Sequence, residues 1–323
     1  MRVPTKLGLY GAGLAALFAG SLAVAQAVMP AEVAPGWAAA AAQEGGTMEE
    51  HAPSGTTGPA AAGTGTDARG LSLEQDGYVL GPVEAPHETG QRGRLSFTVT
   101  GPDGDPLTGY TRSHEKELHL IIVRSDGAGF RHVHPVRDQD GVWSVPWQWD
   151  APGSYRIFAD FVPAALGSNV TLSRTIDVLG DVAGETSPAS RSMSTTAETG
   201  GFTVALDGSL QAGGESTLRF TVTRGGKPVT SLQPYLGAYG HLVALREGDL
   251  AYLHVHPEGE PGDGRTEPGP AIEFMTQAPT AGTYLLYLDF QVDGVVHTAG
   301  FTLTAGTAAS SPGQGGTHGH SSH

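Results

Sequence analysis

Short segments in which hydrophobic and polar residues alternate occupy two regions of the chain, and long stretches with helical periodicity are scarce. The clearest alternation runs over residues 143–149, where tryptophans and a valine are separated by Ser144, Pro146 and Gln148. This pattern predicts a strand with one buried face, and the proline indicates an edge strand or a bulge. The first region is expected to hold about seven short strands, near residues 77–81, 94–100, 117–124, 129–134, 141–149, 154–161 and 171–178.

The second region repeats the first almost without gaps. Residues 94–100 match residues 217–223, and the segment Phe130–Pro135 matches Tyr252–Pro257 with the same His-x-His-Pro motif. An internal repeat of this length indicates that one structural unit is used twice. The second copy is therefore expected to have the same fold and the same chemistry as the first.

A glycine followed two residues later by a tyrosine opens the sixth expected strand in both copies, at Gly153–Tyr155 and Gly282–Tyr284. This feature resembles the tyrosine corner of immunoglobulin-like sandwiches. With frequent turn residues, 48 Gly and 22 Pro, it predicts an all-β fold of two tandem immunoglobulin-like β-sandwich domains. We expect the domains at residues 71–180 and 201–306, joined by a linker over residues 181–200.

The N-terminus carries an export signal. Arg2 and Lys6 precede an uncharged apolar run from Leu7 to Met29, which has the features of a secretory signal and is also long enough to span a bilayer. Residues 1–29 are thus predicted to be a cleaved signal peptide or an uncleaved membrane anchor. In both cases the protein is exported, either secreted or held at the extracytoplasmic face of the cytoplasmic membrane. It meets the membrane only through this segment.

Two further segments lack any sustained periodicity. Residues 30–70 are rich in Ala, Gly, Thr and Pro and are expected to form a disordered tether after the hydrophobic helix. Residues 307–323 form a tail with His318, His320 and His323, which is either a weak metal scavenger or an inert terminus.

Charge and cysteine content narrow the function classes. The formal net charge is −15, so nucleic acid is not an expected partner, whereas cations are attracted. The chain has no cysteine. Disulfides, thiolate metal sites and cysteine nucleophiles are therefore excluded.

Three histidines share the third and fourth expected strands of each copy. A hairpin folded about the turn at residues 125–129 places His119 opposite His134 and Ile121 opposite His132, so the three imidazoles share one face. Opposed Cβ atoms lie about 4.5–5.5 Å apart, close enough for two rings to bind one ion at about 2.0–2.1 Å per Zn–N bond. The second copy repeats the spacing with His241, His254 and His256.

A carboxylate follows in the sixth strand of each copy, at Asp160 and Asp289. That strand can neighbour the third strand of a sandwich, so each aspartate either completes a metal site or has a structural role in capping backbone N–H groups. His114 and His297 occur in one copy only. Three imidazoles with a carboxylate suit Cu2+ or Zn2+.

The structural alternative for the histidines involves no metal. In it His132 and His134 bond to loop carbonyls and hold the turn at Pro135, while His119 is a core residue with its hydrogen bonds satisfied.

With both His-x-His-Pro hairpins and the Gly-x-Tyr…Asp-Phe strands in view, the chain resembles bacterial envelope proteins, secreted or membrane-anchored, with tandem immunoglobulin-like, heavy-metal-associated domains. The resemblance covers residues 71–306. The chain is more distantly similar to copper-resistance domains of the CopC and YtkA-like kind, which implies a sandwich fold and copper carriage. CopC-type proteins use the histidine at the mature N-terminus, where this chain has its tether, so no ligand carries over.

The leading functional hypothesis is extracytoplasmic binding of a divalent transition metal for buffering, resistance or delivery. The partners are then the ion and an envelope metal transporter or other envelope protein. The alternative is a non-enzymatic interaction or scaffold module without metal.

No enzymatic activity is expected. Residues 130–134 superficially resemble the copper-binding strand of Cu/Zn superoxide dismutases, but the zinc-loop histidines and the cysteines of that family are missing.

Overall fold

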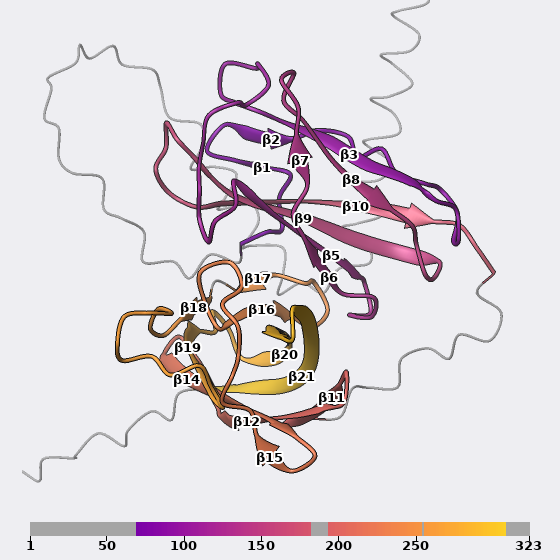
Figure 1. Cartoon of the computed structure of the whole chain (residues 1–323). Coiled ribbons are helices and arrows are strands. Elements are labelled where there is room, and N and C mark those ends of the chain that lie inside the picture. Colours follow the sequence, from indigo (N-terminus) through magenta and orange to yellow (C-terminus); the bar gives the residue numbers. More distant parts are fainter. Residues whose placement is uncertain (1–68, 182–192, 254, 308–323) are drawn as a thin grey trace, which may run out of the picture. The chain divides into compact units, whose positions relative to one another are not determined.

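The computed structural model describes residues 69–181, 193–253 and 255–307 (Figure 1). These residues form β-strands joined by turns, and none of them belongs to a helix that could span a membrane. The segments expected to act as signal peptide or anchor and as histidine tail, almost all of the tether and most of the linker lie outside the described residues.

The first sandwich contains two sheets. Its strands are β1 (Glu74–Gln75), β2 (Tyr78–Leu80), β3 (Gly93–Thr100), β4 (Tyr110–Thr111), β5 (Leu118–Arg124), β6 (Arg131–Val133), β7 (Val136–Arg137), β8 (Val142–Trp147), β9 (Gly153–Pro163) and β10 (Val170–Val178). One sheet has the order β1-β2-β3-β8-β7, and the other has the order β10-β9-β5-β6 with β4 paired to β9.

The second sandwich repeats this plan. Its strands are β11 (Thr196–Thr199), β12 (Phe202–Gly208), β13 (Leu210–Ala212), β14 (Glu215–Arg224), β15 (Lys227–Pro228), β16 (Gly240–Arg246), β17 (Tyr252–Leu253), β18 (Val255–Pro257), β19 (Ala271–Gln277), β20 (Gly282–Val292) and β21 (Val295–Thr307). The sheets have the orders β11-β12-β14-β19-β18, with β15 paired to β14, and β13-β21-β20-β16-β17.

The predicted all-β fold of two immunoglobulin-like sandwiches is confirmed. The seven strands expected in the first copy correspond to β2, β3, β5, β6, β8, β9 and β10, while the short strands β1, β4 and β7 were not expected. Pro146 lies in β8 beyond Trp143 and Ser144, the two residues that β7 covers. Pro146 pairs with Arg94 of β3 on the other side, so β8 is an edge only on the β7 side, where a proline is tolerated.

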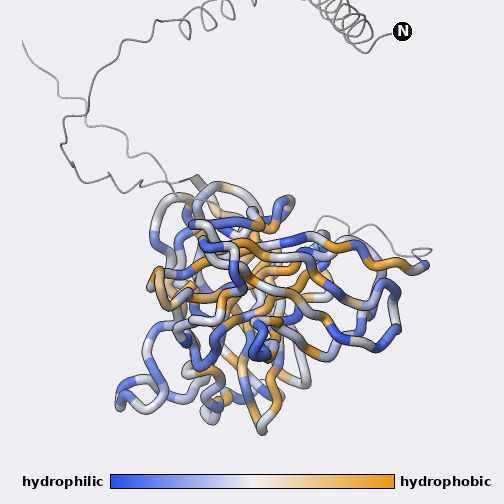
Figure 2. Tube along the Cα trace, turned by 90° about the horizontal axis from the view of Figure 1, so that it is seen from above, coloured by the Kyte–Doolittle hydropathy of each residue, from blue (hydrophilic) through white to orange (hydrophobic). Residues whose placement is uncertain are grey.

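Each sandwich has its own apolar core between its sheets, and the alternation in the sequence creates it. In Figure 2, hydrophobic and hydrophilic residues follow one another at short intervals along the trace. The tyrosine corner is present twice. The hydroxyl of Tyr155 donates to the carbonyl of Ala151 at 2.9 Å, and that of Tyr284 donates to the carbonyl of Thr280 at 3.0 Å. These bonds fix the chain where it enters β9 and β20.

The central strands of one sheet in each sandwich are buried on both faces. In β5, Leu120 and Ile122 enter the sandwich's own core, whereas Ile121 and Val123 point the other way. The outward set forms a separate apolar cluster with residues of the second sandwich, namely Val243, Leu245, Leu250, Leu285 and Tyr287. Both sandwiches belong to one compact unit.

Two further contacts hold this interface. The rings of Phe130 and Tyr287 stack with centroids 4.0 Å apart and planes 3° from parallel. The hydroxyl of Tyr287 also donates to the carbonyl of Gly127 at 2.6 Å. Because side chains alternate along a strand, His119 shares its face with Ile121, and His241 shares its face with Val243. The histidines therefore lie on the faces through which the sandwiches pack.

Candidate metal centre

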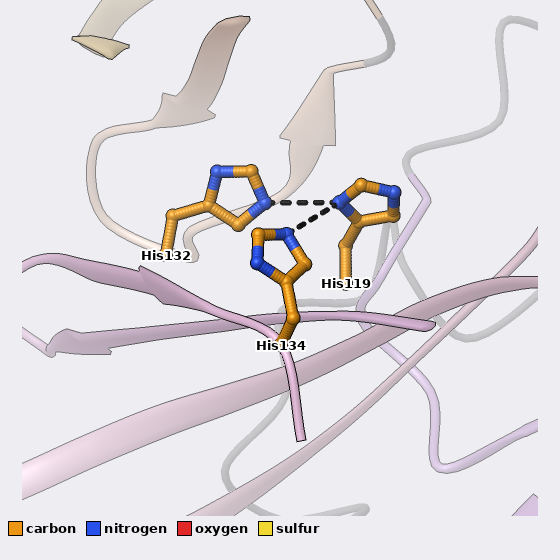
Figure 3. A group of neighbouring side chains, drawn as sticks. All are labelled: His119, His132 and His134. Atoms are coloured by element: carbon orange, nitrogen blue, oxygen red, sulfur yellow. Dashed lines mark hydrogen bonds between the residues drawn. The ribbon is translucent and has the colours of Figure 1, made fainter. Parts of the chain in front are cut away.

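Three imidazoles converge beside the β5–β6 hairpin of the first sandwich (Figure 3). His119 lies in β5, His132 lies in β6 with Ile121 as its cross-strand partner, and His134 follows the end of β6. His119 Nδ1 is 3.1 Å from His132 Nε2 and 3.1 Å from His134 Nε2. One nitrogen from each ring lies within 4.8 Å of the other two. Residues expected to share an ion are thus brought together in this copy.

The spacing of these nitrogens is close to that of ligands in a metal site. Two Zn–N bonds of about 2.0–2.1 Å at a tetrahedral angle place the nitrogens roughly 3.3 Å apart. The two distances of 3.1 Å need only a small ring movement to accept an ion.

The outer nitrogen of His119 determines its tautomer. His119 Nε2 lies 3.0 Å from the carbonyl oxygen of Ser113, an acceptor only, so this nitrogen carries the hydrogen and donates it. In the neutral ring, His119 Nδ1 is then a bare lone pair that points at the other two rings.

The outer nitrogen of His132 has an acidic partner. His132 Nδ1 lies 3.0 Å from Asp289 Oδ2, and both side chains are 4% exposed. With Nδ1–H donating to the carboxylate, a neutral His132 presents a lone pair at Nε2. Two lone pairs then face each other at 3.1 Å between His119 and His132. Only a cation between them, a metal ion or a proton, makes this contact favourable. In metal-binding histidines, the ring nitrogen that does not bind the ion usually donates its hydrogen to a carbonyl or a carboxylate. His119 and His132 both have such a partner.

Burial keeps two of the rings uncharged. Desolvation, followed by repulsion from His132, lowers the pKa of His119 to about 3. The same causes lower the pKa of His134 to about 2. Neutral imidazole is the form that binds metal ions. At neutral pH these two rings are therefore ready to act as ligands without losing a proton.

The two aspartates occupy equivalent positions but have different neighbours. Asp160 is the cross-strand partner of His119, and Asp289 is the cross-strand partner of His241. Asp160 Oδ1 accepts the hydroxyl of Thr171 at 2.6 Å, and burial raises the pKa of this carboxyl. Its side chain has no hydrogen bond to the three imidazoles among the contacts of the described residues. Asp289, by contrast, reaches His132 in the first sandwich.

The second histidine set is described only in part. His241 Nε2 donates to the carbonyl of Tyr235 at 2.7 Å, and burial lowers its pKa to about 4. His254 lies outside the described residues. His256 lies in β18, which pairs with β19 of the opposite sheet, where its partner is Met275. The described part of the second copy therefore shows one oriented imidazole, His241, with its ring centroid 6.3 Å from that of His132.

A strained turn supplies the carbonyl that orients His119. Ser113 and Lys116 close a tight turn with two backbone hydrogen bonds of 2.9 and 3.1 Å. Its central residues, His114 and Glu115, have φ values of 48° and 64°. Glycine and asparagine are the usual residues in such a turn, and strain of this kind tends to occur near functional sites. The ring of His114 lies near those of His119 and His241, at centroid distances of 6.2 and 5.2 Å.

Two partners of the site were missed by the sequence analysis. One is the Ser113 carbonyl, which the turn brings to His119. The other is the contact from Asp289 to His132 across the two sandwiches. The apolar residues on both faces of β5 and β9 were the available signal, because a second buried face requires a second partner surface.

A family profile described as "Domain of unknown function (DUF8832)" matches the chain twice, over residues 74–179 and 196–307. No functionally curated protein matches the chain.

Among solved structures, a putative membrane anchored protein from Corynebacterium diphtheriae is similar at 11% identity and a TM-score of 0.22, covering 72% of this chain and 59% of that one. Invasin, a bacterial integrin-binding protein, is similar at 14% identity and a TM-score of 0.21, covering 72% of this chain and 39% of invasin. A Salmonella alpha-2-macroglobulin mutant has 12% identity and a TM-score of 0.22, with 70% and 14% covered. This chain thus spans less than two thirds of each. Likenesses this weak carry no information on function.

Proposed function

The chain belongs to the DUF8832 domain family through both of its sandwiches, and from this premise we propose that it binds one divalent transition metal ion, Cu2+ or Zn2+, through His119, His132 and His134. The observation that carries the proposal is the 3.1 Å contact between His119 Nδ1 and His132 Nε2, two nitrogens whose rings are each hydrogen bonded through the other nitrogen. The function is binding for buffering, resistance or delivery outside the cytoplasmic membrane, without catalysis.

The donor set supports this class of ion. Three imidazole nitrogens without any thiolate suit Cu2+ and Zn2+ rather than a soft Cu+ site. The net charge of −15 attracts cations. The resemblance of the His-x-His-Pro hairpin to heavy-metal-associated and CopC or YtkA-like domains agrees with the same ligand. An export signal at residues 1–29 would place the site outside the cytoplasm, where an envelope metal transporter or other envelope protein could exchange the ion.

A second candidate is a non-enzymatic scaffold in which the histidines are structural. The observation that favours it is the apolar interface between the sandwiches, which makes a docked pair without any ion. In this case a proton replaces the metal: a charged His132 would donate from Nε2 to His119 and from Nδ1 to Asp289. The two candidates differ in whether metal is bound.

Equilibrium titration of the full chain with Zn2+ and with Cu2+, against a chromophoric chelator, tests the proposal. His318, His320 and His323 are replaced by asparagine throughout, so that the tail does not contribute. One ion per chain is expected, and His132→Asn or His134→Asn should weaken binding by more than the 10–100-fold typical of losing an outer-shell partner. His87→Asn, at an exposed histidine of the same sandwich, is the control. Absent binding, or binding unchanged by the His132 and His134 substitutions, would favour the scaffold.

A further inference from the structure

The candidate centre lies where the two sandwiches meet. His119 is on the outer face of β5 with Ile121, whose side chain is fully buried against the second sandwich. Across this interface, Asp289 reaches His132 and the His241 ring approaches it. The three proposed ligands come from one sandwich, while part of their surroundings comes from the other.

We propose that the second sandwich is a working part of the first sandwich's metal site: Asp289 is a positioning residue for His132, and metal affinity depends on the sandwiches being docked. This inference rests on the proposed function. By linkage, an ion that binds more tightly to the docked form stabilises docking by the same factor.

The contacts of Asp289 fit a positioning role. Its Oδ1 accepts the hydroxyl of Thr298 at 2.6 Å, and its Oδ2 accepts from His132 Nδ1 at 3.0 Å. The carboxylate is therefore fixed on one side and holds the imidazole on the other. A hydrogen bond from the outer nitrogen sets the ring orientation and raises the basicity of the ligating nitrogen.

The chain contains a matched control for this role. Asp160 occupies the same position in the first sandwich, and its Oδ1 accepts the hydroxyl of Thr171 at the same 2.6 Å. The two carboxylates differ in that Asp289 alone is hydrogen bonded to a proposed ligand. Asp160→Asn and Asp289→Asn make the same chemical change and should have different effects on metal binding.

Docking can be disturbed without touching the ligands. Leu245 in β16 has no exposed surface and belongs to the cluster between the sandwiches, not to the core of its own sandwich. A charged residue at this position opposes docking because an unpaired charge would be buried. When the sandwiches separate, the same position faces water, so the second sandwich can remain folded.

The experiment measures two quantities on the full chain with the tail histidines replaced. The first is Zn2+ affinity by competition titration. The second is docking, by energy transfer between dyes on cysteines introduced at Val136 and Val295, which are 74% and 54% exposed. Labelling is site-specific because the natural chain has no cysteine.

Asp289→Asn should lower Zn2+ affinity about 10–100-fold with unchanged energy transfer, and Asp160→Asn should lower it less than about 2-fold. Thr298→Val, which frees the carboxylate, should have an intermediate effect and guards against misfolding of the first variant. Leu245→Asp should reduce both energy transfer and affinity, and adding Asp289→Asn to it should cause little further loss, because the contact is already broken.

Equal affinities for the Asp289 and Asp160 variants, or wild-type affinity in an undocked Leu245 variant, would overturn the inference while leaving metal binding by the three histidines intact. Failure of the proposed function is distinct, since the unsubstituted protein would then bind no Zn2+.

Discussion

His132 and Asp289 form a hydrogen-bonded pair, Nδ1 to Oδ2 at 3.0 Å, although they belong to different sandwiches. Both side chains are 4% exposed, so the pair is shielded from water. The contact exists because His132 in β6 and Asp289 in β20 lie on the faces through which the sandwiches pack, beside Phe130 and Tyr287, whose rings stack across the interface. One surface thus serves both to dock the sandwiches and to orient a proposed metal ligand.

Zinc should stabilise the folded chain through the three imidazoles. An ion that binds only the folded state adds about 2.7 kcal/mol to the free energy of unfolding when its free concentration is 100 times the dissociation constant. His119→Asn should abolish most of this gain, whereas His87→Asn should retain it. Thermal unfolding with Zn2+ and with a chelator measures the difference. A gain that persists in the His119 variant would place the ion elsewhere.

Asp160→Asn should raise stability at pH 7. Burial raises the pKa of this carboxyl in the folded state, so folding at neutral pH disfavours its charged form. The penalty is present above the unfolded pKa and disappears as the pH falls, because the wild-type carboxyl is then protonated in both states. The asparagine still offers Thr171 an acceptor.

Urea unfolding of both proteins at pH 7 and at lower pH checks this. The advantage of the Asp160→Asn variant should shrink as the pH is lowered. A variant that is less stable than wild type at pH 7, or an advantage that grows with acidity, would contradict the assignment of burial as the cause.

Tyr287→Phe isolates one polar contact of the interface. The substitution keeps the ring that stacks on Phe130 but removes the hydroxyl that donates to the Gly127 carbonyl at 2.6 Å. Leaving a buried carbonyl without its partner should cost about 1–3 kcal/mol. Chemical denaturation of the variant measures this loss, and a change within about 0.5 kcal/mol, as for most surface substitutions, would show that this bond does not support the interface.

Glu115→Gly should relieve strain in the turn that orients His119. Glu115 has φ of 64°, and the equivalent position of the second copy is Gly237 with φ of 76°. A left-handed conformation costs a residue with a side chain roughly 1–2 kcal/mol, partly offset by the greater freedom of glycine when unfolded. We expect a net gain of about 0.5–1 kcal/mol, and a loss from the reciprocal variant Gly237→Glu. Equal stabilities for all three proteins would show that the turn is unstrained.

The sequence predicted the fold because local patterns determine it. Alternation in 143–149 identified a strand with one buried face, and the duplicated segments identified the second sandwich. The turn at residues 125–129 fixed the hairpin register, which is why Ile121 faces His132 as expected. Register follows from the side-chain period of two and from turn position, both of which are visible in a single sequence.

The relation between the sandwiches was not predictable in this way. Because of Ile121 and Phe158, strands β5 and β9 are apolar on both faces. A local sequence pattern does not identify the part of the protein that packs against the second face. The repeat also suggested two equivalent sites. The second site stays a prediction, because His254 lies outside the described residues. In both copies the chain crosses to the other sheet soon after the hairpin, where β7 pairs with β8 and β18 pairs with β19. No local pattern marks this crossing, because it depends on tertiary contacts.

X-ray absorption spectroscopy on the zinc-loaded chain, with the tail histidines replaced, tests most directly whether three imidazoles share one ion. The expected result is a first shell with three imidazole nitrogens at about 2.0–2.1 Å, reduced to two in His134→Asn. A shell of oxygen atoms, or an imidazole count that the substitution leaves unchanged, would show that the ion does not bind between His119, His132 and His134.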